Sequence, residues 1–185
     1  WSYIYTASLY YQLVEKVRPD VKVIIVKFLS VPWYLKMISK YYPDIYESIK
    51  TEAEDYEKTL GLSEKERAPK LSALVTAFIE KCSAKYPVFV SVDLVLSKDM
   101  KQFITGFTIK PVGTLYKLDK KNMPYDPTSG VDALNFNFRK FEPSSKQRST
   151  LYKMIPGMLF ETGYYHYNNK NIELSLKFLD KALVF

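Results

Sequence analysis

The sequence predicts an α/β fold: a small Rossmann-like layered sheet with flanking helices, followed by a helical hairpin. Apolar runs rich in β-branched residues at 21–29 and 87–96 alternate with segments of helical periodicity, an order typical of parallel strands covered by helices. The C-terminal segment carries two apolar stripes at helical spacing. We therefore expect an α/β domain at 1–118, an irregular connection at 119–144 and a helical hairpin at 145–185.

The first half of the chain is expected to form a helix, a strand and three more helices. A helix over 4–17 ends before Pro19, because the residue before a proline avoids the α region. The buried strand 21–29 follows. First-turn prolines then open helices over 32–41 and 43–61. The stripe of the third helix consists of Leu71, Leu74, Val75, Phe78, Ile79 and Cys82.

The second half begins with a core strand at 87–96. One or two further strands are expected within 107–118, around Pro111 and Gly113. Turn-forming residues then predict the irregular connection. The hairpin helices are joined by the turn at 168–171, and we expect a kink at Pro156-Gly157.

The hairpin is similar to one tetratricopeptide unit. The positions that match this pattern are Gly163, Ser175, Leu179 and Ala182. Thr162 and His166 depart from it, because the pattern places a leucine and an aromatic residue there. The match is therefore partial, and the unit could be the first of a longer array.

Composition limits the classes of protein. The 185 residues include 47% hydrophobic and 25% charged residues, typical of one folded domain with at most a small appendage. The net charge of +7 is uneven: residues 44–60 carry six acids against two lysines, and residues 98–153 carry eleven basic side chains against five acids. The basic half is typical of a solvated surface, and also of one that faces lipid headgroups. We expect no nucleic-acid partner, because arginine is scarce and no recognition motif is present.

No apolar run approaches the roughly 20 residues of a membrane helix. The chain starts inside a helical pattern, without Met or a signal peptide, and the strand that would normally precede this helix is missing. We therefore expect a piece of a longer protein. The single cysteine, Cys82, excludes an internal disulfide and is expected to be a buried small apolar residue.

Catalytic and cofactor motifs are not found. The six glycines never cluster into a phosphate-binding loop. The sole histidine, His166, lies on a hairpin stripe, so we expect it to serve packing. Paired acids such as Glu52 and Asp55 lie on an outer helix face, where carboxylates keep ordinary pKa values. We expect no catalytic residue, metal or cofactor on this chain.

The candidate ligand-binding residues follow the two expected strands. Open α/β sheets bind ligands outside the carboxyl ends of their strands. Ser30, Trp33 and Tyr34 follow the first strand, and Ser91 and Asp93 lie near the end of the second. Two aromatic rings, hydroxyl groups and a carboxylate suit a sugar. They suit core packing equally, with Trp33 fixing its helix to the sheet.

The N-terminal segment also carries a family resemblance. The residues that carry it are Tyr10, Gln12, Glu15, Arg18, Pro19, Asp20, Val21, Leu29, Pro32, Trp33 and Tyr34. With the later stretches PVFVSVDL and PVGTLYKL they span 1–118. This pattern resembles the segment after the membrane part of a bacterial multi-pass family of unknown function, grouped with transmembrane protein O-mannosyltransferases of the GT-C type.

The resemblance implies that catalysis belongs to a membrane domain, which uses a lipid-linked sugar as donor. This chain is then expected to be a non-catalytic domain on the extracytoplasmic (periplasmic) face of the inner membrane. Its expected partners are its own membrane domain, an acceptor protein and the membrane surface. The alternative is a stand-alone module that binds a sugar or sugar phosphate at the candidate residues. Relatives often carry acids near their equivalent of 1–4, which here reads Trp-Ser-Tyr-Ile.

Overall fold

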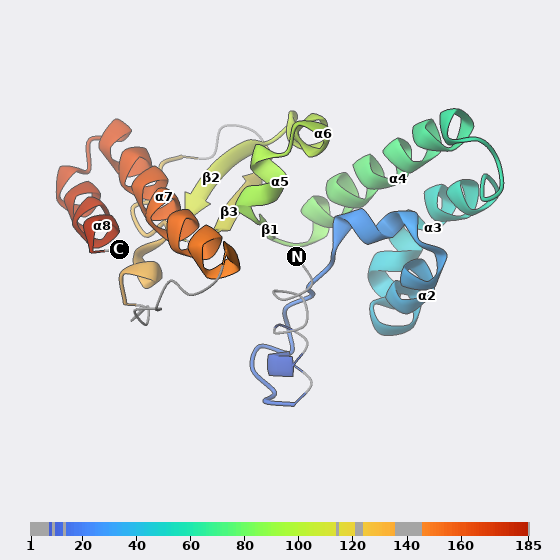
Figure 1. Ribbon diagram of the computed structural model, residues 1–185, viewed down its shortest axis with the longest axis horizontal. Coiled ribbons are helices and arrows are strands. Elements are labelled where there is room, and N and C mark those ends of the chain that lie inside the picture. The colour runs from blue at the N-terminus through green and yellow to red at the C-terminus, as the bar shows by residue number, and fades with distance from the viewer. Residues whose placement is uncertain are drawn as a thin grey trace. The chain divides into compact units, whose positions relative to one another are not determined.

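The computed structural model describes residues 8, 10–12, 14–113, 115–120, 124–135 and 146–184; the side chains of Asp93 and of 146–153 are not described. Its contacts divide the chain into two compact units, Trp1–Ala84 and Lys85–Phe185, and each is described by itself (Figure 1). The fold is mixed α/β: the described first unit is helical, and the second combines a small sheet with helices. The predicted domain bounds at 118 and 144 stay a prediction, although the sheet and the hairpin belong to one compact unit.

Helices form the core of the first unit. They are the 3₁₀ helix η1 (Val26–Ser30) and the α-helices α2 (Pro32–Tyr41), α3 (Pro43–Glu57) and α4 (Glu64–Lys85). The prolines open α2 and α3 as expected, because a first-turn residue needs no N–H donor. The core side chains are Leu29, Tyr34, Leu35, Ile38, Ile45, Ile49, Ala53, Tyr56, Leu74, Val75, Phe78, Ile79 and Cys82. The three predicted helices and the buried cysteine are therefore confirmed.

The predicted strand at 21–29 is wrong. Residues 21–25 have no regular structure, and 26–30 form η1. A buried strand needs a neighbouring strand for its backbone groups. Here those groups bond locally, Phe28 N–H to Ile25 O and Val31 N–H to Phe28 O, both at 2.9 Å. A short apolar run is ambiguous by pattern alone, and in this run only Leu29 is fully buried.

The predicted helix over 4–17 is shorter than expected. Residues 8 and 10–12 are helical, and 4–7, 9 and 13 lie outside the described residues. The chain then turns, with positive φ angles of 55° at Lys16 and 49° at Arg18. Pro19 keeps Arg18 out of the α region, and the turn at Lys16 already ends the helix before that point.

The sheet of the second unit is three-stranded and antiparallel. Its strands are β1 (Val88–Val90), β2 (Thr108–Val112) and β3 (Leu115–Asp119), in the order β1-β3-β2. Val88 pairs with Leu118, and Ile109 also pairs with Leu118 from the other side. The strands predicted within 107–118 are confirmed as a hairpin. Pro111 is tolerated because β2 is an edge strand.

The expected parallel, Rossmann-like sheet is not found among the described residues. Of the strand predicted at 87–96, only 88–90 is extended, and α5 (Val92–Leu96) follows directly. Ser91 O accepts the N–H groups of Leu94 and Val95 at 3.0 and 3.4 Å and so begins that helix. Two short elements, α6 (Lys98–Lys101) and η2 (Gln102–Ile104), lead to β2.

The predicted helical hairpin is confirmed. Helix α7 (Lys146–Asn168) continues through Pro156, and α8 (Ile172–Leu183) follows a turn in which Lys170 has a φ of 63°. Asn171 caps α8 by accepting the N–H of Leu174 at 3.2 Å. The helices approach closely at Gly163, where an added Cβ would lie 3.2 Å from Ser175 O, Phe178 Cβ and Leu179 Cγ.

The described part of the predicted irregular connection, 124–135, joins the sheet to the hairpin. We call it the joint; it includes the 3₁₀ helix η3 (Val131–Asn135). On the sheet side, Lys110 Nζ donates to Pro124 O at 3.0 Å, and Ser129 Oγ donates to Pro111 O at 2.8 Å. On the hairpin side, Lys181 Nζ donates to Leu134 O. The backbone of this segment is therefore bonded into the fold without strand pairing.

Two glycines allow the joint to pack closely. Gly113 and Gly130 have φ angles of 62° and 74°. A Cβ on Gly113 would lie 2.5 Å from Ala133 Cβ; one on Gly130 would lie 2.6 Å from Gly113 N and 2.9 Å from Thr162 Cγ2. Positive φ and lack of space both require glycine at these positions.

We expect Gly130→Ala to lower the free energy of unfolding by about 2 kcal/mol or more, because it adds backbone strain and a steric clash. Gly106→Ala is the control, since no atom lies within 4 Å of its added Cβ, and it should change stability little. Denaturant unfolding of both variants measures the difference. Equal stability of the two would contradict the close packing at Gly130.

Candidate functional site

The polar motif residues near the N-terminus bond to one another. We call this segment, residues 10–21, the clasp. Gln12 Nε2 donates to Arg18 O at 3.3 Å and to Val21 O at 2.6 Å. Tyr10 OH donates to Glu15 Oε1 at 2.7 Å, and Arg18 Nε and Nη2 bind the Asp20 carboxylate at 2.8–3.2 Å. The bond to Arg18 lowers the pKa of Asp20. These groups shape a loop, and their exposed position makes each bond a small contribution to stability.

Tyr34 and Trp33 have opposite environments. Tyr34 is fully buried, its hydroxyl oxygen accepts the Ile25 N–H at 2.7 Å, and its ring meets Phe28 edge-on. Trp33 is 57% exposed and contacts the rings of Phe28 and Tyr34 on one side, at centroid distances of 6.0 and 5.6 Å. The expectation that Trp33 fixes its helix to a sheet is wrong. No strand precedes it among the described residues, and neighbouring helix residues point about 100° apart, so only Tyr34 enters the core.

The structure does not bring the five candidate ligand-binding residues to one strand edge. Ser30, Trp33 and Tyr34 belong to the first unit; Ser91 and Asp93 belong to the second. Ser91 follows β1, and Asp93 lies in α5 with a side chain outside the described set. Their expected proximity depended on two parallel strands, and 21–29 is not a strand. Ligand binding by any of them stays a prediction.

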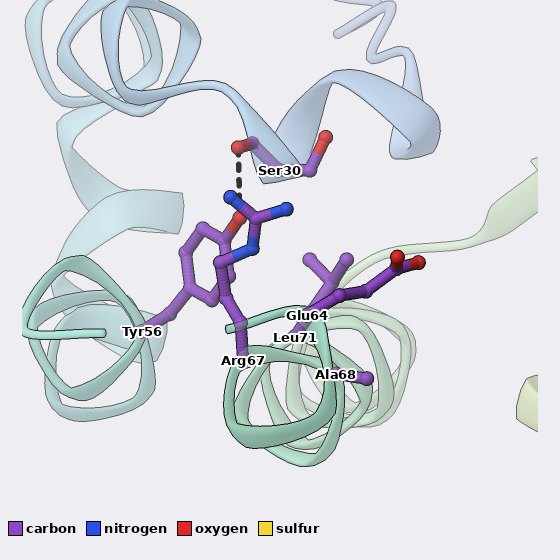
Figure 2. Close-up of a pocket in the computed structure, with 6 residues that line it drawn as sticks. All are labelled: Ser30, Tyr56, Glu64, Arg67, Ala68 and Leu71. Carbon is purple, nitrogen blue, oxygen red and sulfur yellow. Dashed lines mark hydrogen bonds between the residues drawn. The ribbon is translucent and has the colours of Figure 1, made fainter. Parts of the chain in front are cut away.

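One of these residues, Ser30, lines a small hollow in the first unit. The hollow has a volume of about 260 Å³, and its walls are formed by Ser30, Tyr56, Glu64, Arg67, Ala68 and Leu71 (Figure 2). Tyr56 OH donates to Ser30 O at 2.9 Å and fixes one wall. Ser30 Oγ donates to Lys27 O at 3.0 Å. Ligand pockets of enzymes are usually larger, about 300–1,000 Å³, so this hollow suits a small polar group at most.

His166 of α7 forms hydrogen bonds with the joint through both of its ring nitrogens. It is fully buried and stacks on Phe178, with ring centroids 5.4 Å apart. Its Nε2 lies 2.8 Å from Ser129 O, and its Nδ1 lies 2.8 Å from Tyr125 OH. A carbonyl oxygen only accepts, so Nε2 carries the proton and Nδ1 accepts from the phenol. The neutral ring satisfies both bonds.

Burial determines the chemistry of this imidazole. It lowers the pKa of His166, against the opposing effects of the Ser129 carbonyl and the Asp126 charge. A fully buried ring with both nitrogens bonded has no face for a substrate. The expectation that His166 serves packing is therefore confirmed, although the sequence did not predict Tyr125 and Ser129 as its partners.

A row of exposed aromatic side chains lies along α7. We call Phe160, Tyr164 and Tyr167 the aromatic row; they are 54%, 52% and 57% exposed. Consecutive rings are nearly parallel, with interplanar angles of 2° and 16° and centroids 6.5 Å apart. Sequence reasoning missed them, because it followed the buried stripe. Their i, i+4, i+7 spacing on the opposite face was the signal that could have revealed them.

Within the part of the chain that the structure describes, no three His, Cys, Asp or Glu side chains come together in a way that would bind a metal ion. Among the same residues, no helix combines the length and the apolarity required to cross a bilayer.

No protein-family model, curated protein or solved structure matches this chain. The family resemblance therefore depends on the motif residues alone. The structure adds that the polar ones among them bond within their own segment.

We expect folding stability to fall as the pH drops through about 6.5 toward the lower pKa of folded His166. In this window the unfolded chain binds the proton more readily than the folded chain, so protonation favours unfolding; at higher pH the contribution of His166 is fully present. Denaturant unfolding at about pH 7.5 and pH 5.5 measures the change.

His166→Gln is the matched control, and its stability should change less across the same window. Because His166 is the only histidine, its ring resonances in an NMR titration report the folded pKa directly. An ordinary or raised pKa, or an equal slope in the variant, would contradict the burial of a neutral ring.

Proposed function

We propose that this chain is a non-catalytic, extracytoplasmic domain of a membrane glycosyltransferase-like protein related to protein O-mannosyltransferases. In this proposal it binds a polypeptide, either an acceptor protein or the membrane domain of its own protein. The aromatic row is the observation that carries the binding role. The motif resemblance supports the placement in a glycosyltransferase-like protein.

The aromatic row has the properties of an interface anchor. Tyrosine and phenylalanine are enriched at the centres of protein interfaces, and a contiguous exposed apolar patch marks an interaction surface. The stacked rings already restrict one another's rotamers. The aromatic row would therefore lose less side-chain entropy when a partner binds than isolated aromatic side chains would.

The bonding of His166 and of the clasp carboxylates supports a non-catalytic role. General acid–base catalysis needs a titrating side chain within reach of the substrate. The only histidine is buried and saturated with bonds. The clasp carboxylates of Glu15 and Asp20 are bonded to Tyr10 and Arg18. These residues shape the protein surface.

The hairpin fits the same proposal as a unit of tetratricopeptide type. In such repeats, small residues allow the two helices to pack closely together. The exposed surfaces of the repeats bind extended partners. The close approach of Gly163 to Ser175 and Leu179 supports this interpretation. The exposed aromatic row then lies on the binding surface of the unit.

We expect no sugar transfer when the 185-residue chain is incubated with a lipid-linked mannose donor and a Ser/Thr-rich acceptor polypeptide. The full-length membrane protein is the positive comparison, because the proposed catalytic apparatus lies in its membrane domain. Turnover by this chain would overturn the non-catalytic role.

We expect the same chain to bind the unfolded acceptor polypeptide, with binding weakened at least tenfold in the triple variant Phe160→Ala, Tyr164→Ala, Tyr167→Ala, because the anchors are lost. Phe89→Ala is the control; Phe89 is 46% exposed and belongs to β1 instead of α7. Calorimetric titration measures the affinities. Equal loss in both variants, or no binding to either polypeptide or membrane domain, would contradict the proposal.

A further inference from the structure

The outer face of α2 has an unusual composition for a solvent-facing helix surface. Tyr34, Leu35 and Ile38 form the buried stripe of this helix. At about 100° per residue, the remaining arc holds one basic edge and one apolar edge, and the apolar edge borders the buried stripe at Tyr41. We call this arc the α2 outer face; its residues are Trp33, Lys36, Met37, Lys40 and Tyr41.

The apolar edge of this face is open to solvent. Trp33 is 57% exposed, Tyr41 is 60% exposed, and Met37 between them is half-buried. In an ordinary amphipathic surface helix, the positions that these three residues occupy would be polar. Trp33 and Tyr41 lie eight positions apart, which spans about 12 Å along the axis. An aromatic residue therefore stands at each end of an exposed apolar strip.

The basic edge lies directly beside it. Helix α2 contains no acidic residue. Lys36 and Lys40 are exposed, and neither forms an ion pair with any described residue. Lys40 Nζ lies 5.4 Å from the centroid of the Tyr41 ring, so cation and aromatic ring share one edge. The face therefore presents two unneutralised positive charges next to aromatic and thioether groups.

The adjacent helix does not cancel this charge completely. Most acids of α3 are paired with lysines: Asp44 with Lys22, Glu47 with Lys50, Glu52 with Lys81, and Asp55 with Lys58 and Lys70. Glu54 and Glu57 form no ion pair among the described residues, and they oppose a purely electrostatic attraction to anions. The apolar edge must therefore contribute a large part of any affinity.

Tryptophan and tyrosine beside lysine are the residue types that position a protein at a membrane–water boundary. Their rings lie at the headgroup level, and lysine ammonium groups reach the phosphates while their stems cover apolar surface. Helices that lie in this boundary combine a basic edge with an aromatic one and bind anionic lipid more strongly than neutral lipid. The α2 outer face has this arrangement over its whole length.

We propose that the α2 outer face binds the surface of a bilayer that contains anionic phospholipid. Trp33, Met37 and Tyr41 enter the boundary between headgroups and acyl chains, and Lys36 and Lys40 contact lipid phosphates. The inference deepens the proposed function and rests on it, since a domain attached to a membrane protein is held next to a bilayer. It assigns a lipid contact to the first unit, whereas the polypeptide contact belongs to α7.

The test uses the 185-residue chain with vesicles of phosphatidylcholine, alone or mixed with an equal amount of phosphatidylglycerol. We expect co-sedimentation with the mixed vesicles only, weakened by salt. In a Trp1→Phe background the emission of Trp33 should shift to shorter wavelength on binding, because its ring leaves water. The double variants Trp33→Ala, Tyr41→Ala and Lys36→Gln, Lys40→Gln should each bind at least tenfold more weakly.

Matched controls are available in the second unit. Lys98→Gln, Lys101→Gln removes two exposed lysines of α6, and Leu96→Ala removes an apolar side chain that is 75% exposed; both should bind as the parent does. Circular dichroism checks that every variant folds. Absence of binding to mixed vesicles, an unshifted Trp33 emission, or greater loss in the α6 variant than in the α2 variants would overturn the proposal.

The vesicle assay contains no sugar donor and no polypeptide. Its failure would leave the polypeptide titration of the aromatic row unaffected. Loss of polypeptide binding would likewise leave the vesicle result in place.

Discussion

The second unit depends on a buried polar joint between its sheet and its hairpin. His166 of α7 reaches Ser129 and Tyr125 in the joint, and Lys110 of β2 reaches Pro124 from the other side. Buried polar groups must be hydrogen-bonded, and loss of one partner leaves the other unsatisfied at a cost of about 1–3 kcal/mol. This requirement fixes the position of a segment that has little regular structure.

Close packing at the same joint explains why Gly113 and Gly130 cannot be replaced by a residue with a side chain. Gly113 ends β2, and Gly130 precedes η3. Their positive φ angles bring Ala133 and Thr162 within contact of the turn. On the helix that carries His166, Thr162 lies close to Gly130, and Leu159 packs with the side chains of Ala133 and Phe178. Close packing leaves the opposite side of this helix free to carry the exposed aromatic row.

Function in this protein is proposed at surfaces and not in a cleft. The one hollow described, next to Ser30, is small and has walls that are already hydrogen-bonded. By contrast, the aromatic row on α7 and the outer face of α2 expose large rings beside ordered neighbours. The two faces differ in chemistry: the first is a series of stacked rings, and the second joins rings to two lysines that form no ion pair with a described residue. We therefore propose different partners for them, a polypeptide for the first face and a lipid surface for the second.

The amino-acid sequence by itself determined the features that depend on near neighbours. Prolines set the starts of α2 and α3, and apolar spacing set the burial of Cys82 and the two helices of the hairpin. Only the tertiary structure decided the strand pairing, because a run such as 21–29 becomes a strand only where a second strand can satisfy its backbone. It also decided that Tyr34 is buried while Trp33 is exposed. The expected proximity of the candidate ligand-binding residues depended on that strand, and the partners of His166 were unpredictable because they lie far away in the sequence.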